Sequence, residues 1–531
     1  MQLKHVAKGG LLAGLMALAM TGSAFAVTLH MHNGGEPASL DPHKVSGTWE
    51  NRIVGDYLEG LTTEAANGDA IAGAAESWDI SEDGLVYTFH LRQDAVWSDG
   101  TPVTAHDFVT AFQRLMNPET AASYAYLQYT IKNAEAINSG EIEDLNELGA
   151  VALDDYTLEV TLENPAPFLL QALTHYTAYP VPSHLLEEHG DAWADTANIV
   201  ANGPYVPVEW LPGSHLRSVK NDSYHDADNV QIEEVIYYSL DDLSAALNRY
   251  RAGEFDILTD FPADQITLLD SQHPGEAHVA PFLGLHYYVF NLNNPDLADV
   301  NVRKALSMAI NREIIGPDIF GTGELAAYSW VPPGTANYID GAFTYDWAET
   351  PYGERVAEAQ ALMAEAGFGP DNPLSVEIRY NTSDNHQRLA VAIAAMWEQL
   401  GVQTELFNSE VVVHYDALQA NDFHSIGRAG WVMDYNDPIN MLELLRTGID
   451  YNYGRYDNDE YNALIAASAT ETDIDARAAI LAEAEALAME DYAALPLAFY
   501  VSRNVVSPRI SGFEDNASDI HRTRWLTKSE D

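Results

Sequence analysis

The sequence predicts an α/β protein of two or three sub-domains, and three observations support this prediction. From residue 285 onward, helical periodicity alternates with short apolar runs typical of strands, which is the order expected of an α/β lobe. Apolar residues make up 47% of the chain and aromatic residues 10%, so a large core can form despite the high charge. The length of 531 residues exceeds what a single core usually holds.

The first 26 residues predict an exported protein. Two lysines precede an apolar run over 11–20, and Ala24-Phe25-Ala26 supplies a small-residue cleavage pattern, so we expect residues 1–26 to be a cleavable signal peptide. This run is shorter than the roughly 20 apolar residues of a membrane span. The absence of cysteine excludes disulfides, thiolate metal sites and a lipidated cysteine. A periplasmic location without a lipid anchor is therefore expected.

The charge is extreme: 80 acidic residues against 26 basic ones give a formal net charge of −54. Nucleic acid and anionic membranes are poor partners for such a field. The acids are spread along the chain, which favours an acidic, solvated surface adapted to high salt. The alternative, an acidic face for a cationic ligand, has no obvious focus in the sequence.

Local patterns place the elements in order. In the first half, Thr104 and Asp107 have the spacing of a capping box before an apolar helical stripe. The expected strands are 27–32, 86–92, two within 151–163, 235–240, 375–380, 403–407 and 495–501. The expected helices are 48–58, one after 104, 243–252, 302–310, 354–366, 386–400 and 476–489. No repeat or low-complexity linker is present, so we expect chain crossings to join the lobes.

The most informative segment is 428–438, an apolar strand bracketed by Arg428 and Asp434 and closed by Pro438. Side chains six positions apart on a strand point the same way, with Cα atoms up to about 20 Å apart. A ligand with an ammonium, an extended backbone and a carboxylate would fit this face, and that ligand is a short peptide. Gly430 would leave room for its backbone. The alternative is an ordinary buried strand that ends in a loop carboxylate.

A search for catalytic patterns predicts no enzyme. The sequence has no G-x-S-x-G elbow, no P-loop and no G-x-G-x-x-G loop. His184 and His189 lack zinc-site spacing, and 457–460 lacks the glycine and closing glutamate of a calcium loop. No cofactor and no metal are expected.

Several long motifs together resemble one family. They are Ser39-Leu40-Asp41-Pro42-His43, the stretch 87–109, Asn202-Gly203-Pro204-Tyr205, Val302-Arg303-Lys304-Ala305-Leu306, Asn381-Thr382-Ser383-Asp384 and the segment around Trp431. The chain resembles the periplasmic oligopeptide-binding proteins, the large solute-binding subunits of peptide ABC importers, over nearly all of its mature length. This resemblance implies a three-lobed, clamshell α/β fold with mixed sheets and a hinge between two main lobes.

The resemblance also implies lobe limits and partners. Lobe I would comprise 27–58, 182–284 and 500–531, lobe II 59–181, and lobe III 285–499. The partners would be a short peptide and the membrane permease subunits of an ABC importer, with the protein itself a monomer.

Particular residues match the family's binding positions. Asp434 matches the partner of the peptide's α-ammonium, and Arg428 and His386 match receivers of its C-terminal carboxylate. The backbone groups of Arg428, Gly430 and Val432 match the strand that pairs with the peptide. Tyr126 matches a contact near the peptide's N-terminus. We interpret Trp431 as a packing side chain that could also stack on the ligand.

Three departures concern the ligand's carboxylate and side chains. Broad-specificity relatives carry an arginine at the position of Gln419, a tryptophan at that of Val412 and a glutamate at that of Ser46, so the preferred peptide is not fixed by the resemblance. The alternatives are a family member for a murein peptide, an oligosaccharide or a nickel chelate, and an exported hydrolase.

Overall fold

The computed structural model describes residues 27–529 except 123 and 322, and it leaves out the side chains of 411 and 412. The predicted signal peptide, 1–26, lies outside the described residues. Among those described, no helix is both long and apolar enough to cross a membrane.

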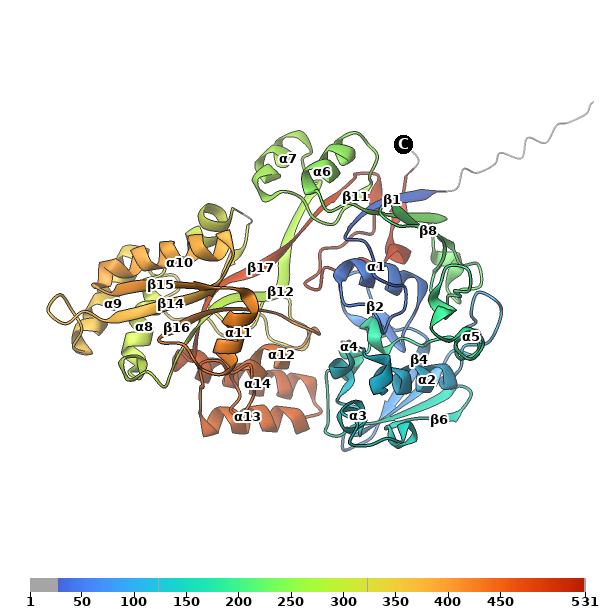
Figure 1. Ribbon diagram of the computed structural model, residues 1–531, viewed down its shortest axis with the longest axis horizontal. Coiled ribbons are helices and arrows are strands. Elements are labelled where there is room, and N and C mark those ends of the chain that lie inside the picture. Colours follow the sequence, from blue (N-terminus) through green and yellow to red (C-terminus); the bar gives the residue numbers. More distant parts are fainter. Residues whose placement is uncertain (1–26, 123, 322, 530–531) are drawn as a thin grey trace, which may run out of the picture.

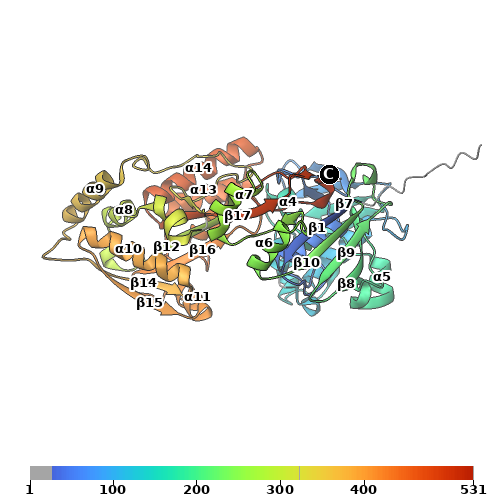
Figure 2. The same cartoon turned by 90° about the horizontal axis from the view of Figure 1, so that it is seen from above.

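Two bodies are joined by two long neighbouring strands, β12 (Ala277–Phe290) and β17 (Ala494–Val506) (Figure 1). We call residues 27–281 and 501–529 the N-terminal body and residues 285–499 the C-terminal body. One mixed sheet runs through both bodies and twists between them (Figure 2). Its strand order is β15 (Gln403–Ser409), β14 (Ser375–Asn381), β16 (Ile426–Val432), β12 (Ala277–Phe290), β17 (Ala494–Val506), β11 (Ile257–Leu258), β1 (Thr28–Gly34), β10 (Glu234–Ser239), β9 (His215–Lys220) and β8 (Tyr205–Leu211), with β13 (Leu325–Ala326) beside β17.

Smaller sheets complete the N-terminal body. They pair β2 (Thr62–Glu64) with β3 (Ala70–Ala72), β18 (Ile510–Ser511) with β19 (Thr527–Lys528), and order β4 (Ala75–Ile80), β5 (Val86–Leu91), β7 (Thr157–Thr161) and β6 (Ala150–Asp154). Its helices are α1 (Thr48–Tyr57), α2 (Ala105–Met116), α3 (Ala134–Asn138), α4 (Leu169–Ala172), α5 (Ser183–His189), α6 (Leu243–Arg251) and α7 (Ile266–Gln272).

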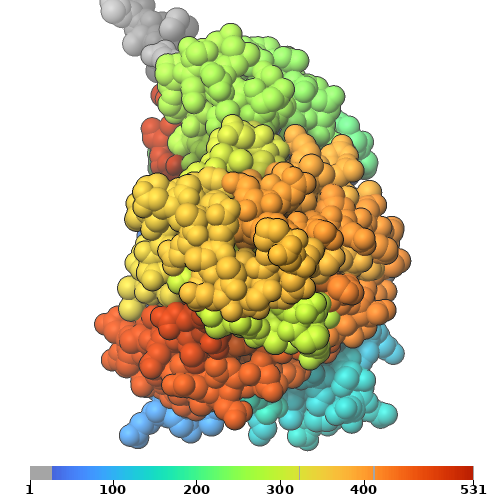
Figure 3. All heavy atoms as spheres, turned by 90° about the vertical axis from the view of Figure 1, so that its left-hand side faces the viewer, coloured from blue at the N-terminus to red at the C-terminus, as the bar shows by residue number. Residues whose placement is uncertain are grey.

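The C-terminal body packs helices around its part of the sheet, and Figure 3 looks onto its outer face, coloured yellow to orange. Its helices are α8 (Val300–Met308), α9 (Tyr352–Glu365), α10 (Asp384–Trp397), α11 (Val411–Gln419), α12 (Ile439–Leu442), α13 (Asp459–Thr470) and α14 (Ile474–Glu490). The predicted α/β class is confirmed.

The hinge lies where β12 and β17 lose register. Pro281 pairs with Val501, and the next pair is Leu285 with Phe499, so 282–284 on β12 oppose Tyr500 alone. Extra residues on one strand form a bulge, which leaves local groups unpaired and bends the strand. The two strands can therefore bend here when the bodies close, with little loss of hydrogen bonding in the part of the sheet that belongs to each body.

The buried side chains divide in a similar way. One core draws its buried residues from the range between Leu283 and Phe499, and Phe168 and Ala517 of the N-terminal body pack against it. A second core covers most of the N-terminal body and joins the predicted lobes I and II without a break. A third, smaller core lies under α6 and α7. The division of the N-terminal body into two lobes stays a prediction.

The C-terminal tail fastens the N-terminal body through long-range polar contacts. Lys528 Nζ donates to the Thr28 carbonyl oxygen at 2.6 Å and to Asp256 at 2.7 Å. Arg522 pairs with Glu64 at 3.0 Å, and both side chains are buried. The first and last described segments thus complete one body together.

Candidate ligand-binding site

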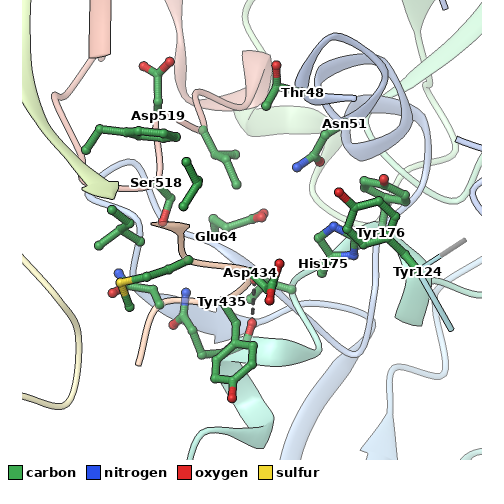
Figure 4. Close-up of a pocket in the computed structure, with 18 of the residues that line it drawn as sticks. Thr48, Asn51, Glu64, Tyr124, His175, Tyr176, Asp434, Tyr435, Ser518 and Asp519 are labelled. Atoms are coloured by element: carbon green, nitrogen blue, oxygen red, sulfur yellow. Dashed lines mark hydrogen bonds between the residues drawn. The ribbon is translucent and has the colours of Figure 1, made fainter. Parts of the chain in front are cut away.

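Two cavities open into the cleft between the bodies, and both are lined by Asp434 and Tyr435. The smaller, about 270 Å³, also contacts the hinge and the start of α1 (Figure 4). The larger, about 980 Å³, lies between the segments 126–130 and 163–168 of the N-terminal body and α12–α14 of the C-terminal body. Asp434 therefore marks the junction of the two cavities.

A buried ion pair fixes the loop that carries Asp434. Arg477 of α14 donates two hydrogen bonds of 2.8 Å to Asp437, and both side chains are at most 1% exposed. The Asp437 carboxylate also accepts from the backbone N–H of Ile439, the first residue of α12. The loop after β16 thus has a rigid support.

Asp434 is held by amide and hydroxyl groups instead of a cation. Tyr126 Oη donates to its Oδ1 at 3.2 Å, and Asn440 Nδ2 lies 3.5 Å from its Oδ2. Among the described residues, no basic side chain lies within 4 Å of this carboxylate. Burial raises the pKa of Asp434, while hydrogen bonds from Asn440 and Tyr126 oppose that rise. A ligand ammonium would supply the missing counter-charge.

The contact between Tyr126 and Asp434 crosses the cleft, as does a ring stack beside it. Phe168 and Tyr435 stack with centroids 4.7 Å apart and planes 8° from parallel. The structure therefore brings Tyr126 of the N-terminal body to Asp434 of the C-terminal body, although 308 positions separate them in sequence.

The edge of β16 next to the cleft is free over most of its length. β14 pairs with β16 only at Ile426 and Gly427. On the other edge, the Met433 N–H donates to the Leu283 carbonyl oxygen, so odd-numbered residues bond to β12. Successive residues of a strand direct their backbone groups to opposite edges, so the N–H and C=O groups of residues 428, 430 and 432 point to the free edge. The Arg428 carbonyl oxygen already accepts from His414.

Arg428 is 6% exposed, and among the described residues no carboxylate lies within 4 Å of it. Its guanidinium donates to Asn381, Tyr415, Tyr500 and His286 at 3.1–3.5 Å. A buried guanidinium without an anion is costly. Arg428 is therefore suited to an incoming carboxylate.

His386 lies at the start of α10, and its Nδ1 is 3.2 Å from the Asn381 carbonyl oxygen. Burial and, to a smaller extent, Arg428 lower the pKa of His386 to about 4. The side chain is thus neutral at pH 7 in the unliganded protein, and a carboxylate ligand would raise this pKa.

Gly430 and Trp431 have roles within the protein itself. A Cβ on Gly430 would lie 2.7 Å from Tyr500 Oη and 2.9 Å from Arg428 Nη2, so a larger residue would displace the ends of these two side chains. Trp431 Nε1 donates to Asn440 at 2.8 Å, and its ring lines the larger cavity. Trp431 is thus tied to the support of Asp434.

The remaining predicted site residues differ in position. Val432 and Ser46 are exposed and line the smaller cavity. Gln419 is exposed at the end of α11, where its carbonyl oxygen accepts from Arg455, and it is not among the described residues that line either cavity.

Sequence reasoning missed the side chains that support the two charges, namely Asn440, Tyr435, Phe168, Tyr415, Tyr500, His286 and Asn381. Asn440 stands two residues after Pro438, in the first turn of a helix, where an asparagine often bonds to a preceding loop. Tyr435 directly follows Asp434, and the others come from distant segments and leave no local signal. The described residues contain no group of three potential metal ligands.

We expect Asn440→Ala to make binding more sensitive to acid. Only the ionised Asp434 attracts an ammonium, so affinity is full above the pKa of Asp434 and falls as the pH drops through it. Loss of the Asn440 hydrogen bond raises this pKa further, so the fall in affinity on the acid side begins at a higher pH. Calorimetry of trialanine binding from pH 4 to 7 measures the shift, and at pH 7 we expect a loss of about 1 kcal/mol.

The matched control is Asn462→Ala, which removes an amide that lines the same cavity but bonds to Thr447. This control variant should lose affinity at the same pH as the wild type. If Asn440→Ala also lost affinity at the wild-type pH, Asn440 would not control the ionisation of Asp434.

Of the predicted charged residues, Asp434 lines both cavities, whereas Arg428 and His386 line neither of them. Two bodies joined by two strands, with a carboxylate at two cavities between them, define a clamshell ligand-binding protein. Residues 69–453 match the family described as bacterial extracellular solute-binding proteins, family 5 Middle. The chain belongs to this family, and the predicted clamshell fold and non-enzymatic class are confirmed.

Known proteins agree over nearly the whole length. The periplasmic oligopeptide-binding protein OppA of Salmonella typhimurium is 39% identical over 492 residues, which cover 92% of this chain and 89% of that protein. The murein tripeptide-binding protein MppA in its unliganded open form has a TM-score of 0.89 at 35% identity, covering 95% and 98% of the two chains. The structure of Haemophilus influenzae OppA in complex with RPPGFSPFR has a TM-score of 0.71 at 34% identity, covering 95% of this chain and 99% of that chain. The bodies of this chain are thus arranged more like the open form.

Proposed function

We propose that the protein captures short peptides by their backbone and both termini and delivers them to the permease subunits of an ABC importer. One observation carries this proposal: Asp434 and Arg428 lie at the two ends of the free edge of β16, and neither has an ion-pair partner among the described residues. The similarity to an oligopeptide-binding protein supports it.

Binding would combine three contributions. The ammonium meets Asp434, the main chain adds to the free edge of β16 as a further strand, and the carboxylate meets Arg428 or His386. Closure at the hinge removes these groups from water, which strengthens the charged contacts. The two cavities take side chains, and their size allows bound water to adapt to different residues.

Blocked peptides test this proposal. Calorimetry would compare trialanine with its N-acetylated and C-amidated forms, each of which removes one terminal charge. We expect each modification to weaken binding by about 2 kcal/mol or more, because a buried charge loses its partner. If both blocked peptides bound as well as trialanine, recognition of the termini would be excluded.

Peptide length should decide which side chain receives the carboxylate. With the ammonium fixed at Asp434, each added residue moves the carboxylate by about 3.3–3.6 Å. We expect Arg428→Ala and His386→Ala to weaken di-, tri- and tetrapeptides by different factors, measured by calorimetry. If each substitution weakened all three peptides by the same factor, peptide length would not decide which side chain receives the carboxylate. The exposed Arg388→Ala on α10 serves as a control and should affect none of them.

The location and assembly are part of the proposal. The predicted signal peptide and the absence of cysteine favour a soluble periplasmic monomer without a lipid anchor. Murein peptides are candidate ligands of the same chemical class, since MppA is described as a murein tripeptide-binding protein.

We expect the protein to be more stable in high salt. With 80 acids against 26 bases, repulsion is screened over about 30 Å at 0.01 M salt and about 3 Å at 1 M. The melting temperature should rise markedly between these sodium chloride concentrations. A flat melting temperature would mean that the acids are compensated locally, and the salt-adaptation proposal would fail.

A further inference from the structure

The Arg428 end of β16 gathers cations and donors in a chain that is otherwise strongly acidic. Arg379, on the neighbouring β14, is 9% exposed and pairs in register with Gly427. Like Arg428, it has no carboxylate within 4 Å among the described residues. Two other buried arginines, Arg303 and Arg312, also lack an acidic partner in the described part of the chain, but backbone carbonyl oxygens accept from their guanidiniums. Within the same described ranges, the guanidinium of Arg428 donates to side chains alone.

Donors around Arg428 outnumber acceptors. We define the Arg428 cluster as Arg428, His286, Asn381, Tyr415 and Tyr500. Both tyrosine oxygens accept a hydrogen bond from the guanidinium, which leaves each O–H free to donate, and no acceptor for them appears among the hydrogen bonds of the described residues. The Nε of Arg428 is buried without a partner. These groups can bind an anion with no rearrangement of the backbone.

Glu324 acts on Tyr500, where its effect on the pKa is smaller than those of burial and of Arg428. Tyr415 and Tyr500 are half-buried, so part of each side chain is exposed to solvent.

We propose that the Arg428 cluster binds a small inorganic anion such as chloride when no peptide is present. The anion neutralises the buried guanidinium and accepts from the two tyrosine hydroxyls. In salty surroundings it competes with the carboxylate of the ligand, and this second statement rests on the proposed peptide-binding function. The same salt that screens the acidic surface would then weaken, by a common factor, the binding of every ligand that places a carboxylate in this cluster.

Bromide locates the site directly, because it can replace chloride and scatters anomalously. In crystals of the unliganded protein grown with sodium bromide, we expect an anomalous peak within hydrogen-bond distance of the Arg428 guanidinium. The peak should vanish in Arg428→Gln and persist in Arg388→Gln, which removes an exposed arginine of the same body. Wild-type crystals without a peak at Arg428 would overturn the proposal.

Competition is measured in solution with trialanine at equal ionic strength in sodium chloride and sodium fluoride. Screening is then the same, while fluoride is more strongly hydrated and binds such donors less. At 1 M we expect the Kd in chloride to exceed that in fluoride by about fivefold. The ratio should approach one for C-amidated trialanine, which has no carboxylate to displace.

The outcomes separate the two proposals. Trialanine that fails to bind in either salt refutes the peptide function, while the bromide peak still decides the anion site. Trialanine that binds equally in both salts, without a bromide peak, refutes the anion site alone.

Discussion

Asp434→Asn should weaken trialanine binding by about 2–5 kcal/mol, because the ammonium loses its charged partner in a site that closure removes from water. The amide nearly matches the carboxylate in shape and can still accept from Tyr126, so the loss reports charge more than packing. Calorimetry at pH 7 measures the effect. Asp371→Asn is the matched control, since Asp371 is exposed on the same body.

A second measurement ties the loss to the ammonium. N-acetylated trialanine lacks that charge, so the wild type and Asp434→Asn should bind it with similar, weak affinity. A double-mutant cycle then gives the coupling between Asp434 and the ammonium. Unchanged trialanine affinity in a correctly folded variant would remove Asp434 from the site.

The largest effect on stability is expected for Arg477→Met. This substitution leaves the Asp437 carboxylate buried without its cation, which typically costs about 3–5 kcal/mol. Denaturant unfolding of the unliganded protein measures the change. The loop of Asp434 would lose its support as well, so peptide affinity should fall with stability.

Two controls isolate the cause. Arg446→Met breaks an exposed pair with Glu443 in the same body and should cost less than about 1 kcal/mol. The double variant Asp437→Asn/Arg477→Met removes both charges and should be more stable than Arg477→Met alone. If Arg477→Met were as stable as Arg446→Met, the buried pair would contribute little.

Much of the fold could be predicted because its signals are local. Thr104 and Asp107 form the expected cap at the start of α2, with the Thr104 N–H donating to Asp107 at 2.9 Å. The run 428–432 is a strand, as its apolar pattern indicated. At 457–460, the sequence excluded a calcium loop but did not suggest a helix. Asn458 caps α13 there, a role its side chain and the following acids could have revealed.

The site could be predicted only in part. Its two charged residues, Arg428 and Asp434, are close in sequence, but most of the side chains around them come from distant segments. The order of Arg428 and Asp434 along one segment indicated a ligand with two charged ends, although β16 ends at Val432 and Asp434 lies in the loop that follows. That each lacks an ion partner depends on side chains from other segments, including Tyr126, Asn440 and Tyr500. The interpretation of Gly430 shows the same limit: Tyr500, about 70 positions away, already occupies the space above it.

The joining of the two chain ends sets the order in which this molecule can fold. Lys528 bonds to Thr28 across 500 positions, and β11 of the N-terminal body pairs with the far end of β17. The buried core of the C-terminal body, by contrast, is drawn from the two hinge strands and the segment between them. This core can therefore form before the last residues of the chain arrive, whereas the N-terminal body needs those residues. A chain threaded N-terminus first through a narrow pore would keep its leading half unfinished until the passage is complete, which would suit the export proposed for this protein.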